Sequence, residues 1–218
     1  MKLNDNLAIG LKLSASNIPK AGVGVFTTPT VMAGTPVCEM KGDKLLREQV
    51  SNRYTSGLDL PEGVGAVPIY AIKHPSAKAK GADGEQLDIY IDCHPQLSIE
   101  EIGMGGFIND KYDFKNRPEK PKWWSDSPQP IEGQRNWYEP NRKKMKFLIA
   151  KGYNVYFWPV PLQPYFMLLS LRKIEAGEEL YVDYGDAYWK AWKNQVELPN
   201  NVTKAIEDSK PNSPVILK

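Results

Sequence analysis

The spacing of glycine and proline is the feature that most constrains how this chain can fold. Between residues 7 and 50 these two residue types recur about every six to ten positions, with short apolar runs between them. Runs of this length suit strands joined by tight turns better than they suit helices. The same pattern of short apolar runs occurs again later, in LDIYIDC, YNVYFWPV, PYFMLLSLRKI and EELYVDYG. We therefore expect a mainly β fold of short strands in several small sheets.

Helical patterns are few. Three segments carry them, namely KLLREQVSNRY, SIEEIGMGG and AYWKAWKNQV. The second begins with Ser98 and has Glu101 three residues later, a pairing that satisfies backbone N–H groups at the start of a helix. We expect each of these helices to be short.

Chain length and composition favour one domain. The chain has 218 residues, of which 41% are hydrophobic and 25% charged, values typical of a globular protein with a sizeable core. Domains cluster near about 100 to 150 residues, so a second core is not expected. We predict one domain over residues 1–197 and a polar C-terminal tail over residues 198–218.

A segment of different composition interrupts this domain at about residues 110–153. It is rich in Pro, Lys, Trp and Asn and has no sustained periodicity, which indicates a long surface insertion. Insertions of this length are functional lids or mobile segments. Its tryptophans, Trp123, Trp124 and Trp137, argue against complete disorder.

The sequence carries no signal for a membrane. No stretch approaches the roughly 18 consecutive apolar residues that span a bilayer. The first residues, MKLNDNLAIGLKLS, lack the apolar run of a signal peptide. We expect an intracellular protein without membrane contact, and the sequence does not distinguish the nucleus from the cytoplasm.

Cysteine usage and charge argue against a metal site and a nucleic-acid binder. Cys38 and Cys93 lie in no CxxC or Cys/His cluster, so no metal is expected, and each is a core thiol or a partner in one disulfide. The net charge is only +2, and no direct nucleic acid binding is expected. The local cluster of Arg142, Lys143, Lys144 and Lys146 is interpreted as a solvated face, ahead of a phosphate or acidic-partner contact.

Three short motifs are candidates for function, and each has an ordinary structural alternative. Gly22-Val23-Gly24-Val25-Phe26 lets the backbone approach a ligand, or marks a turn. Asn109, which ends Gly105-Gly106-Phe107-Ile108, and Asn154 need hydrogen-bond partners, either the backbone or a ligand. The tyrosines of Gly177-Glu178-Glu179-Leu180-Tyr181-Val182-Asp183-Tyr184-Gly185 are core residues or site residues.

Together and in this order, these motifs resemble the SET-domain family of protein lysine methyltransferases. The first signature of the family is matched by residues 22–26 and by Gly34-Thr35-Pro36-Val37-Cys38-Glu39-Met40-Lys41-Gly42. The second resembles Ile91-Asp92-Cys93, Gly103, residues 106–109 and, past the insertion, Asn154-Val155. The third, Ile, x, x, Gly-Glu-Glu-Leu, x, x, Asp-Tyr-Gly, is matched in full from Ile174 to Gly185.

The resemblance implies a SET-type β-clip fold with a threaded C-terminal segment, and methyl transfer from S-adenosylmethionine to a lysine of a protein, a histone or another. It implies Tyr184 as the catalytic residue. It implies cofactor contacts at Gly22, Val23, Gly24, Val25, Asn109, Asp110 and Trp189, the last competing with Tyr188 and Trp192. Channel walls are expected at Tyr156, Phe157, Tyr165 and Val182. A SET-like module that binds protein with little or no activity is the alternative.

The chain departs from the family pattern at several positions. Met40 stands where the family has Tyr, Gly106 where it has Arg, and Asp110-Lys111 where it has His-Ser. No cysteine follows Cys93, so the zinc-binding cysteine tail of many histone-directed members is absent from this sequence. We expect AYWKAW or the Trp-rich insertion to close the site instead.

Overall fold

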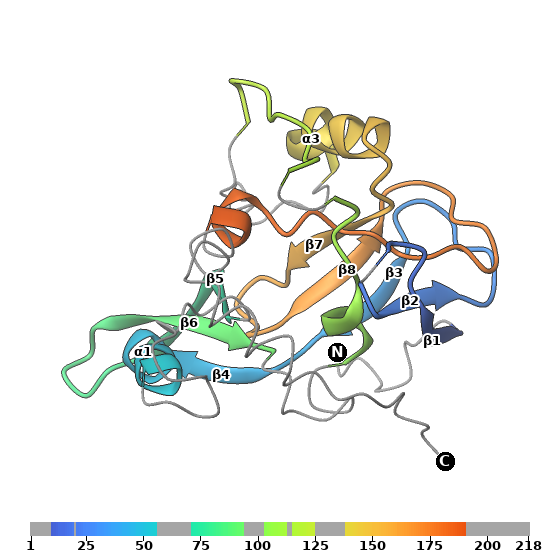
Figure 1. Ribbon diagram of the computed structural model, residues 1–218. Coiled ribbons are helices and arrows are strands. Elements are labelled where there is room, and N and C mark those ends of the chain that lie inside the picture. Colours follow the sequence, from blue (N-terminus) through green and yellow to red (C-terminus); the bar gives the residue numbers. More distant parts are fainter. Residues whose placement is uncertain are drawn as a thin grey trace, which may run out of the picture.

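Eight short strands form three small antiparallel sheets in the computed structural model, which describes residues 10–19, 21–55, 71–93, 103–112, 115–124 and 138–190 (Figure 1). The first sheet is a hairpin of β1 (Leu11–Ala15) and β2 (Val23–Thr27). The second has the order β3-β8-β7, with bounds Pro36–Met40, Phe166–Ser170 and Val155–Pro159. The third has the order β4-β6-β5, with bounds Asp43–Leu46, Gln86–Asp92 and Ala71–Lys80.

Helices make up a minor part of the described structure. They are α1 (Arg47–Thr55), the 3-10 helix η1 (Met104–Phe107) and α3 (Tyr138–Ala150). A further helix begins at Asp186 and is described as far as Lys190. The expected fold class, mainly β with small sheets and few short helices, is confirmed.

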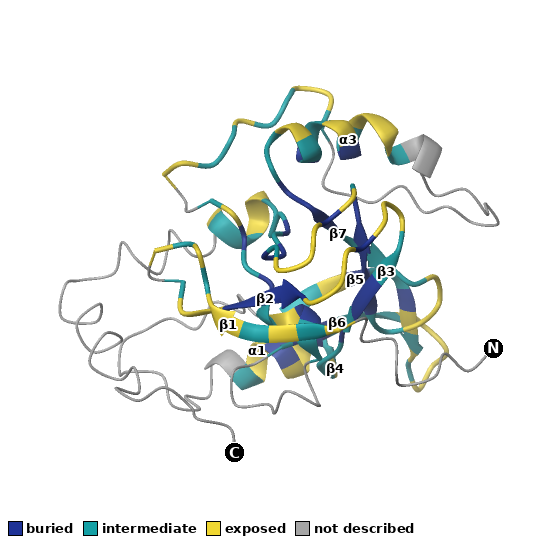
Figure 2. Cartoon of the chain, turned by 90° about the vertical axis from the view of Figure 1, so that its right-hand side faces the viewer, coloured by how far each residue is buried: buried dark blue, intermediate teal, exposed yellow. Residues whose placement is uncertain are grey.

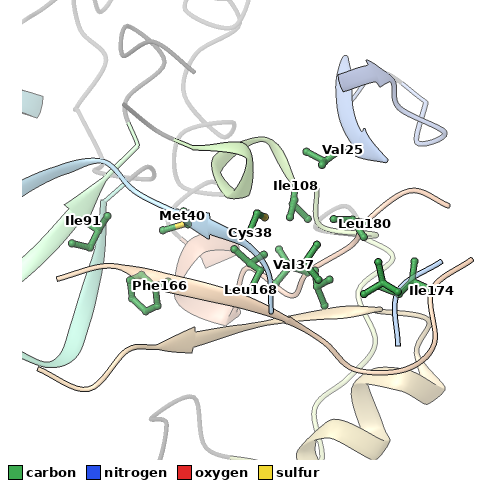
Figure 3. Packing of buried hydrophobic residues seen from close by; sticks show 13 residues of the cluster. Val25, Val37, Cys38, Met40, Ile91, Ile108, Phe166, Leu168, Ile174 and Leu180 are labelled. Atoms are coloured by element: carbon green, nitrogen blue, oxygen red, sulfur yellow. The ribbon is translucent and has the colours of Figure 1, made fainter. Parts of the chain in front are cut away.

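The main core lies around β8, whose five residues are all buried. A strand that is covered on both faces needs apolar side chains on both, and the FMLLS sequence supplies them with only one polar residue. Figure 3 shows this core, to which β2, β3, β6 and the segments before Asn109 and after Gly177 all contribute side chains. Its labelled members are Val25, Val37, Cys38, Met40, Ile91, Ile108, Phe166, Leu168, Ile174 and Leu180.

The segment from Glu178 to Tyr184 passes between three other parts of the chain. Its backbone bonds first to β2, where Leu180 N donates to Val25 O at 2.8 Å. Val182 N then donates to Asn109 O at 3.0 Å, and Tyr181 O accepts from Asn154 N and Val155 N, each at 3.2 Å. A C-terminal stretch is thus enclosed by segments that precede it by up to 155 residues in the chain.

This segment was expected to be a regular strand, and the structure differs. Residues 178–185 make only isolated bridges, Phe26 with Glu179 and Asn109 with Tyr181. A ladder requires the same neighbour over several residues, whereas this segment changes partner every one or two residues. The apolar pattern indicated burial correctly, but the exchange of partners is a tertiary feature.

Strands β5 and β4 were not expected from the sequence. Strand β5 contains Pro75, which lacks the N–H of a ladder, and its pairing with β6 shifts register between Lys73 and Lys78. Bulges of this kind accommodate proline in a strand. Helix α1 was expected from Lys44, but Asp43–Leu46 pairs with β6 as β4, and the helix begins at Arg47.

The insertion contains a third unexpected element, helix α3. Met145 and Leu148 are buried at helical spacing, and with Tyr153 and Leu171 they form a second apolar cluster to which Trp124 also packs. Pro140 lies in the first turn, where a missing N–H costs no helical bond. Figure 2 shows α3 buried on the side toward the rest of the chain and exposed on its outer side. The insertion therefore has a folded part. Its helix was not expected because the lysines around Met145 and Leu148 make the apolar periodicity hard to recognise in the sequence.

The remaining expectations concern cysteines, membranes and some of the predicted helices. Cys38 and Cys93 are both free thiols, and burial raises the pKa of each to about 12, as is typical of core thiols. Among the described residues, no helix is long and apolar enough to cross a bilayer. Trp137, most of the SIEEIGMGG helix, the end of AYWKAWKNQV and the tail at 198–218 lie outside the described residues.

Candidate active site

The diglycine turn near the N-terminus meets the C-terminal motif. Gly22 has a φ of +73°, which favours glycine, and leads into β2, where Phe26 bridges to Glu179. Val23 is 48% exposed, whereas Val25 is fully buried, so the turn has an open outer side and a packed inner side. Apart from Gly22 and its two chain neighbours, no atom of the described residues lies within 4 Å of the position that a Cβ on Gly22 would take.

A buried carboxylate, that of Glu179, connects the turn to the rest of the site. It is 1% exposed and accepts hydrogen bonds from four donors. These are Ser16 Oγ at 2.6 Å, Asn17 N at 2.7 Å, Tyr181 OH at 2.8 Å and Asn109 Nδ2 at 3.4 Å. Burial, and to a lesser extent the bond to Glu179, raises the pKa of Tyr181 to about 12, so the hydroxyl remains a donor.

The second glycine of the turn is required by this carboxylate. A Cβ on Gly24 would lie 2.1 Å from Glu179 Oε1 and 3.4 Å from Asn109 Nδ2. The distance to Glu179 Oε1 is far shorter than a real contact, and the carboxylate is held by its donors, so it has little freedom to move. Gly24 therefore makes room for Glu179.

Asn109 and Asn154 have different roles. Asn109 Nδ2 donates to Val23 O at 2.9 Å and to Glu179 Oε1, and both partners are acceptors, which fixes the orientation of the amide. Among the described residues, no donor bonds to Asn109 Oδ1. Asn154 is fully buried and bonds to the backbone of Tyr181 and Glu179, each at 2.7 Å. Asn154 is thus a structural residue, while Asn109 retains an acceptor oxygen that no described donor engages.

Tyr184 lies beside Asn109 at the end of the motif. Its hydroxyl donates to the carbonyl oxygen of Ile108 at 2.8 Å, and its ring packs at the margin of the main core. The ring centroid of Tyr188 is 4.6 Å away in an edge-on arrangement, and that of Trp189 is 6.3 Å away and nearly parallel. The sequence-predicted residues Tyr184, Asn109 and Trp189 are therefore close together.

Asp110, which follows Asn109, holds the Tyr184 segment in place. Its Oδ2 accepts from Tyr184 N at 3.0 Å and from Trp189 Nε1 at 2.8 Å. Its Oδ1 accepts from Tyr112 N at 3.1 Å and from Tyr153 OH at 2.9 Å. Burial raises the pKa of this carboxyl and outweighs the donors, which lower it. Because the side chain is engaged within the protein, a cofactor contact at Asp110 would have to come from its backbone.

Two cations from the insertion each pair with Asp183 and Asp186, the carboxylates that flank Tyr184 in the sequence. Arg117 donates from Nη2 to Asp183 Oδ1 at 2.5 Å and from Nη1 to Asp186 Oδ1 at 2.7 Å. Lys120 Nζ lies 3.2 Å from an oxygen of each of these two carboxylates. Asp186 is exposed, but Arg117, Lys120 and Asp183 are largely buried, and removing one of these three leaves an uncompensated buried charge, which is destabilising. The insertion is thus part of the frame around Tyr184.

Sequence patterns gave no role to Glu179, Arg117, Lys120 or Tyr153. A signal for Glu179 existed, since an acidic residue directly before buried Leu180 needs donors. No spacing links Arg117 and Lys120 to Asp183 and Asp186, which lie more than 60 residues away. Only the tertiary fold reveals that group.

The expected channel residues do not all share one surface. Tyr156 and Phe157 are neighbours in β7 and point to opposite faces, because strand side chains alternate. Tyr156 packs on the cluster beneath α3, whereas Phe157 packs on the main core, 6.1 Å from the ring of Phe166. Val182 is 1% exposed and lies two residues before Tyr184, while Tyr165 is half-buried directly before β8.

Two of the positions that depart from the family pattern, Met40 and Gly106, lie in regular elements of the fold. Met40 is a buried residue of β3, paired with Phe166, and Gly106 is exposed in η1. Within the described ranges, no group of three or more His, Cys, Asp or Glu side chains is placed to hold a metal ion.

A model of the SET domain matches residues 22–185, well over half of the chain, and the chain therefore belongs to the SET-domain family. No curated protein matches it in sequence.

Similar solved structures include the methyltransferase domain of human PR domain-containing protein 2, with 16% identity, a TM-score of 0.41 and coverage of 80% of this chain and 76% of that one. Another is Chaetomium thermophilum Polycomb Repressive Complex 2 bound to GSK126, with 17% identity, a TM-score of 0.46 and coverage of 87% and 18%. A third is the same complex in an autoinhibited conformation bound to S-adenosylmethionine. It has 17% identity and a TM-score of 0.44, and the match covers 94% of this chain and 17% of that one. The chain spans less than a fifth of the length of the Polycomb chains.

The contact between Gly24 and Glu179 leads to a double-mutant prediction. Gly24→Ala should destabilise the fold by about 1 to 3 kcal/mol, because the new methyl group displaces the carboxylate. In a Glu179→Ala background the same change should cost about 1 kcal/mol less, since the space is then free. Urea unfolding of the four proteins measures this coupling. Strictly additive effects would contradict the assignment of Gly24 to Glu179.

Proposed function

We propose that this chain is an S-adenosylmethionine-dependent protein-lysine N-methyltransferase. The observation that carries the proposal is the place of Tyr184, whose hydroxyl bonds to Ile108 O at 2.8 Å, one residue before Asn109, which bonds to the diglycine turn. A fixed phenol next to a turn with an open outer side suits a reaction that depends on alignment. The partner is a protein that presents a lysine, a histone or another, inside the cell.

The described residues fit the cofactor in three respects. The outer side of the turn is open at Gly22 and exposed at Val23, so its backbone is accessible. Asn109 Oδ1 is an acceptor suited to the ammonium group of an amino acid end. Among the described residues the donors to the Glu179 carboxylate are all neutral, so this carboxylate favours a cation nearby. When bound, S-adenosylmethionine supplies an electrophilic methyl group.

The chain's own task is to prepare the lysine amine. Free lysine has a pKa near about 10.4, so an aromatic, poorly solvated surrounding that disfavours its charged form is needed. Tyr184, Tyr188 and Trp189 offer such a surface, with ring centroids between 4.6 and 6.3 Å apart. In this proposal the Tyr184 hydroxyl orients the amine, and the packed rings exclude water.

A second candidate is a SET-like module that binds protein with little activity. It is favoured by Asp110, which stands in place of the family's histidine and whose carboxylate is fully engaged by Trp189, Tyr184, Tyr153 and Tyr112. The two candidates differ in cofactor binding, which the module does not require.

Removing the Tyr184 hydroxyl tests the proposal. Label transfer from S-adenosylmethionine to a mixture of histones and cell extract should fall about a hundredfold in Tyr184→Phe, because the reacting groups lose their alignment. The matched control is Tyr112→Phe, which loses an equivalent bond to Lys151 O at 2.7 Å and should retain activity. Equal transfer by both variants, or none by the wild type, would refute the proposal.

The size of Val182 leads to a prediction about the product. By resemblance, the residue two before the catalytic tyrosine limits how many methyl groups are added, and valine is smaller than the usual Phe or Tyr. We expect the enzyme to proceed beyond monomethylation. Mass spectra of a good substrate should contain dimethylated or trimethylated lysine, and single methylation at complete conversion would reject this assignment.

A further inference from the structure

The small net charge of the chain conceals an uneven distribution. The insertion, residues 110–153, contains 11 Lys and Arg against 6 Asp and Glu. The rest of the chain contains 17 Lys and Arg against 20 Asp and Glu, so positive charge is concentrated in the insertion. From Asn141 to Lys151 there are five cations and no acidic residue. Non-specific association with polyanions depends on such local fields and less on net charge.

Three of the four cations of α3 are exposed. Arg142, Lys143 and Lys146 are all exposed, and their spacing places them on one face of the helix. Lys122 is likewise exposed in the segment packed beside it. We name Lys122, Arg142, Lys143 and Lys146 the basic face. Figure 2 shows that the outer side of α3 is exposed along the described part of the helix.

Three members of the basic face have no acidic partner among the described residues. These are Lys122, Lys143 and Lys146. Like charges three or four residues apart on a helix destabilise it by about 0.2 to 0.5 kcal/mol per pair. Repulsion of this kind persists in the free protein and is relieved when an anion binds.

Aromatic packing fixes the basic face to the molecule. Trp124 packs edge-on against Phe147 of α3, with centroids 5.3 Å apart, and Lys144 Nζ lies 4.7 Å from its ring centroid. Trp123 is 42% exposed, and Lys143 Nζ lies 4.4 Å from its ring centroid. The helix and the 115–124 segment therefore present their cations on a preformed surface, which lowers the entropic cost of binding.

We propose that the basic face binds the phosphate backbone of a nucleic acid duplex without reading its sequence. A duplex presents a regular, rigid row of phosphates, which the outer side of a helix can follow with cations one turn apart. An acidic peptide would have to be ordered on an outward-facing helix surface, at a cost in conformational entropy. We thereby revise the expectation drawn from net charge, and binding at the basic face does not depend on methyl transfer.

The test measures binding of a labelled DNA duplex, and of an RNA duplex of the same sequence, by fluorescence anisotropy at several salt concentrations. The variant K122Q/K143Q/K146Q removes three cations of the basic face. The control K12Q/K44Q/K80Q removes three exposed lysines elsewhere, which also lack an ion pair among the described residues. Both variants change the net charge equally, and thermal unfolding verifies that both are folded.

We expect the wild type and the control to bind alike, and the basic-face variant to bind at least about tenfold more weakly in low salt. The slope of log K against log salt should become shallower by about 0.9 for each phosphate that the variant no longer neutralises. Binding of either duplex supports the proposal and identifies the nucleic acid. Equal weakening in both variants, no binding by the wild type in low salt, or stronger binding of polyglutamate than of either duplex would overturn it.

Discussion

The backbone hydrogen bonds of residues 178–182 are the constraint on which the rest of the structure depends. Buried N–H and C=O groups need partners, and those of this segment find them in β2, in Asn109 and in residues 154–155. A shift of the segment would break bonds in all three places at once. The position of Tyr184 is therefore determined by parts of the chain that lie far apart in sequence.

Two buried carboxylates extend this constraint from the backbone to the site. Glu179 joins the residues before the diglycine turn to Asn109 and Tyr181, and Asp110 joins Tyr184 to Trp189 and Tyr153. Buried carboxylates are tolerated where donors surround them, and each of these has four. The turn and the tyrosine are thereby each held by hydrogen bonds from several parts of the chain, which suits the alignment that the proposed reaction requires.

Much of this was predictable from the sequence, for local reasons. Short apolar runs between Gly and Pro gave the strands, and three ordered motifs gave the family, the turn and Tyr184. Strand β5 was missed because Pro75 and its lysines suppress the strand pattern, and α3 because its lysines concealed Met145 and Leu148. The pairing of Arg117 and Lys120 with Asp183 and Asp186 has no local signal, since it exists only in the fold.

The central claim is that the diglycine turn and the Tyr184 segment together form a cofactor site. The most direct measurement is the thermal unfolding of the intact chain over a titration of S-adenosylmethionine. We predict a saturable gain in stability, about 2.7 kcal/mol at roughly one hundred times the dissociation constant. A folded protein whose unfolding does not change at any concentration of S-adenosylmethionine would contradict this claim.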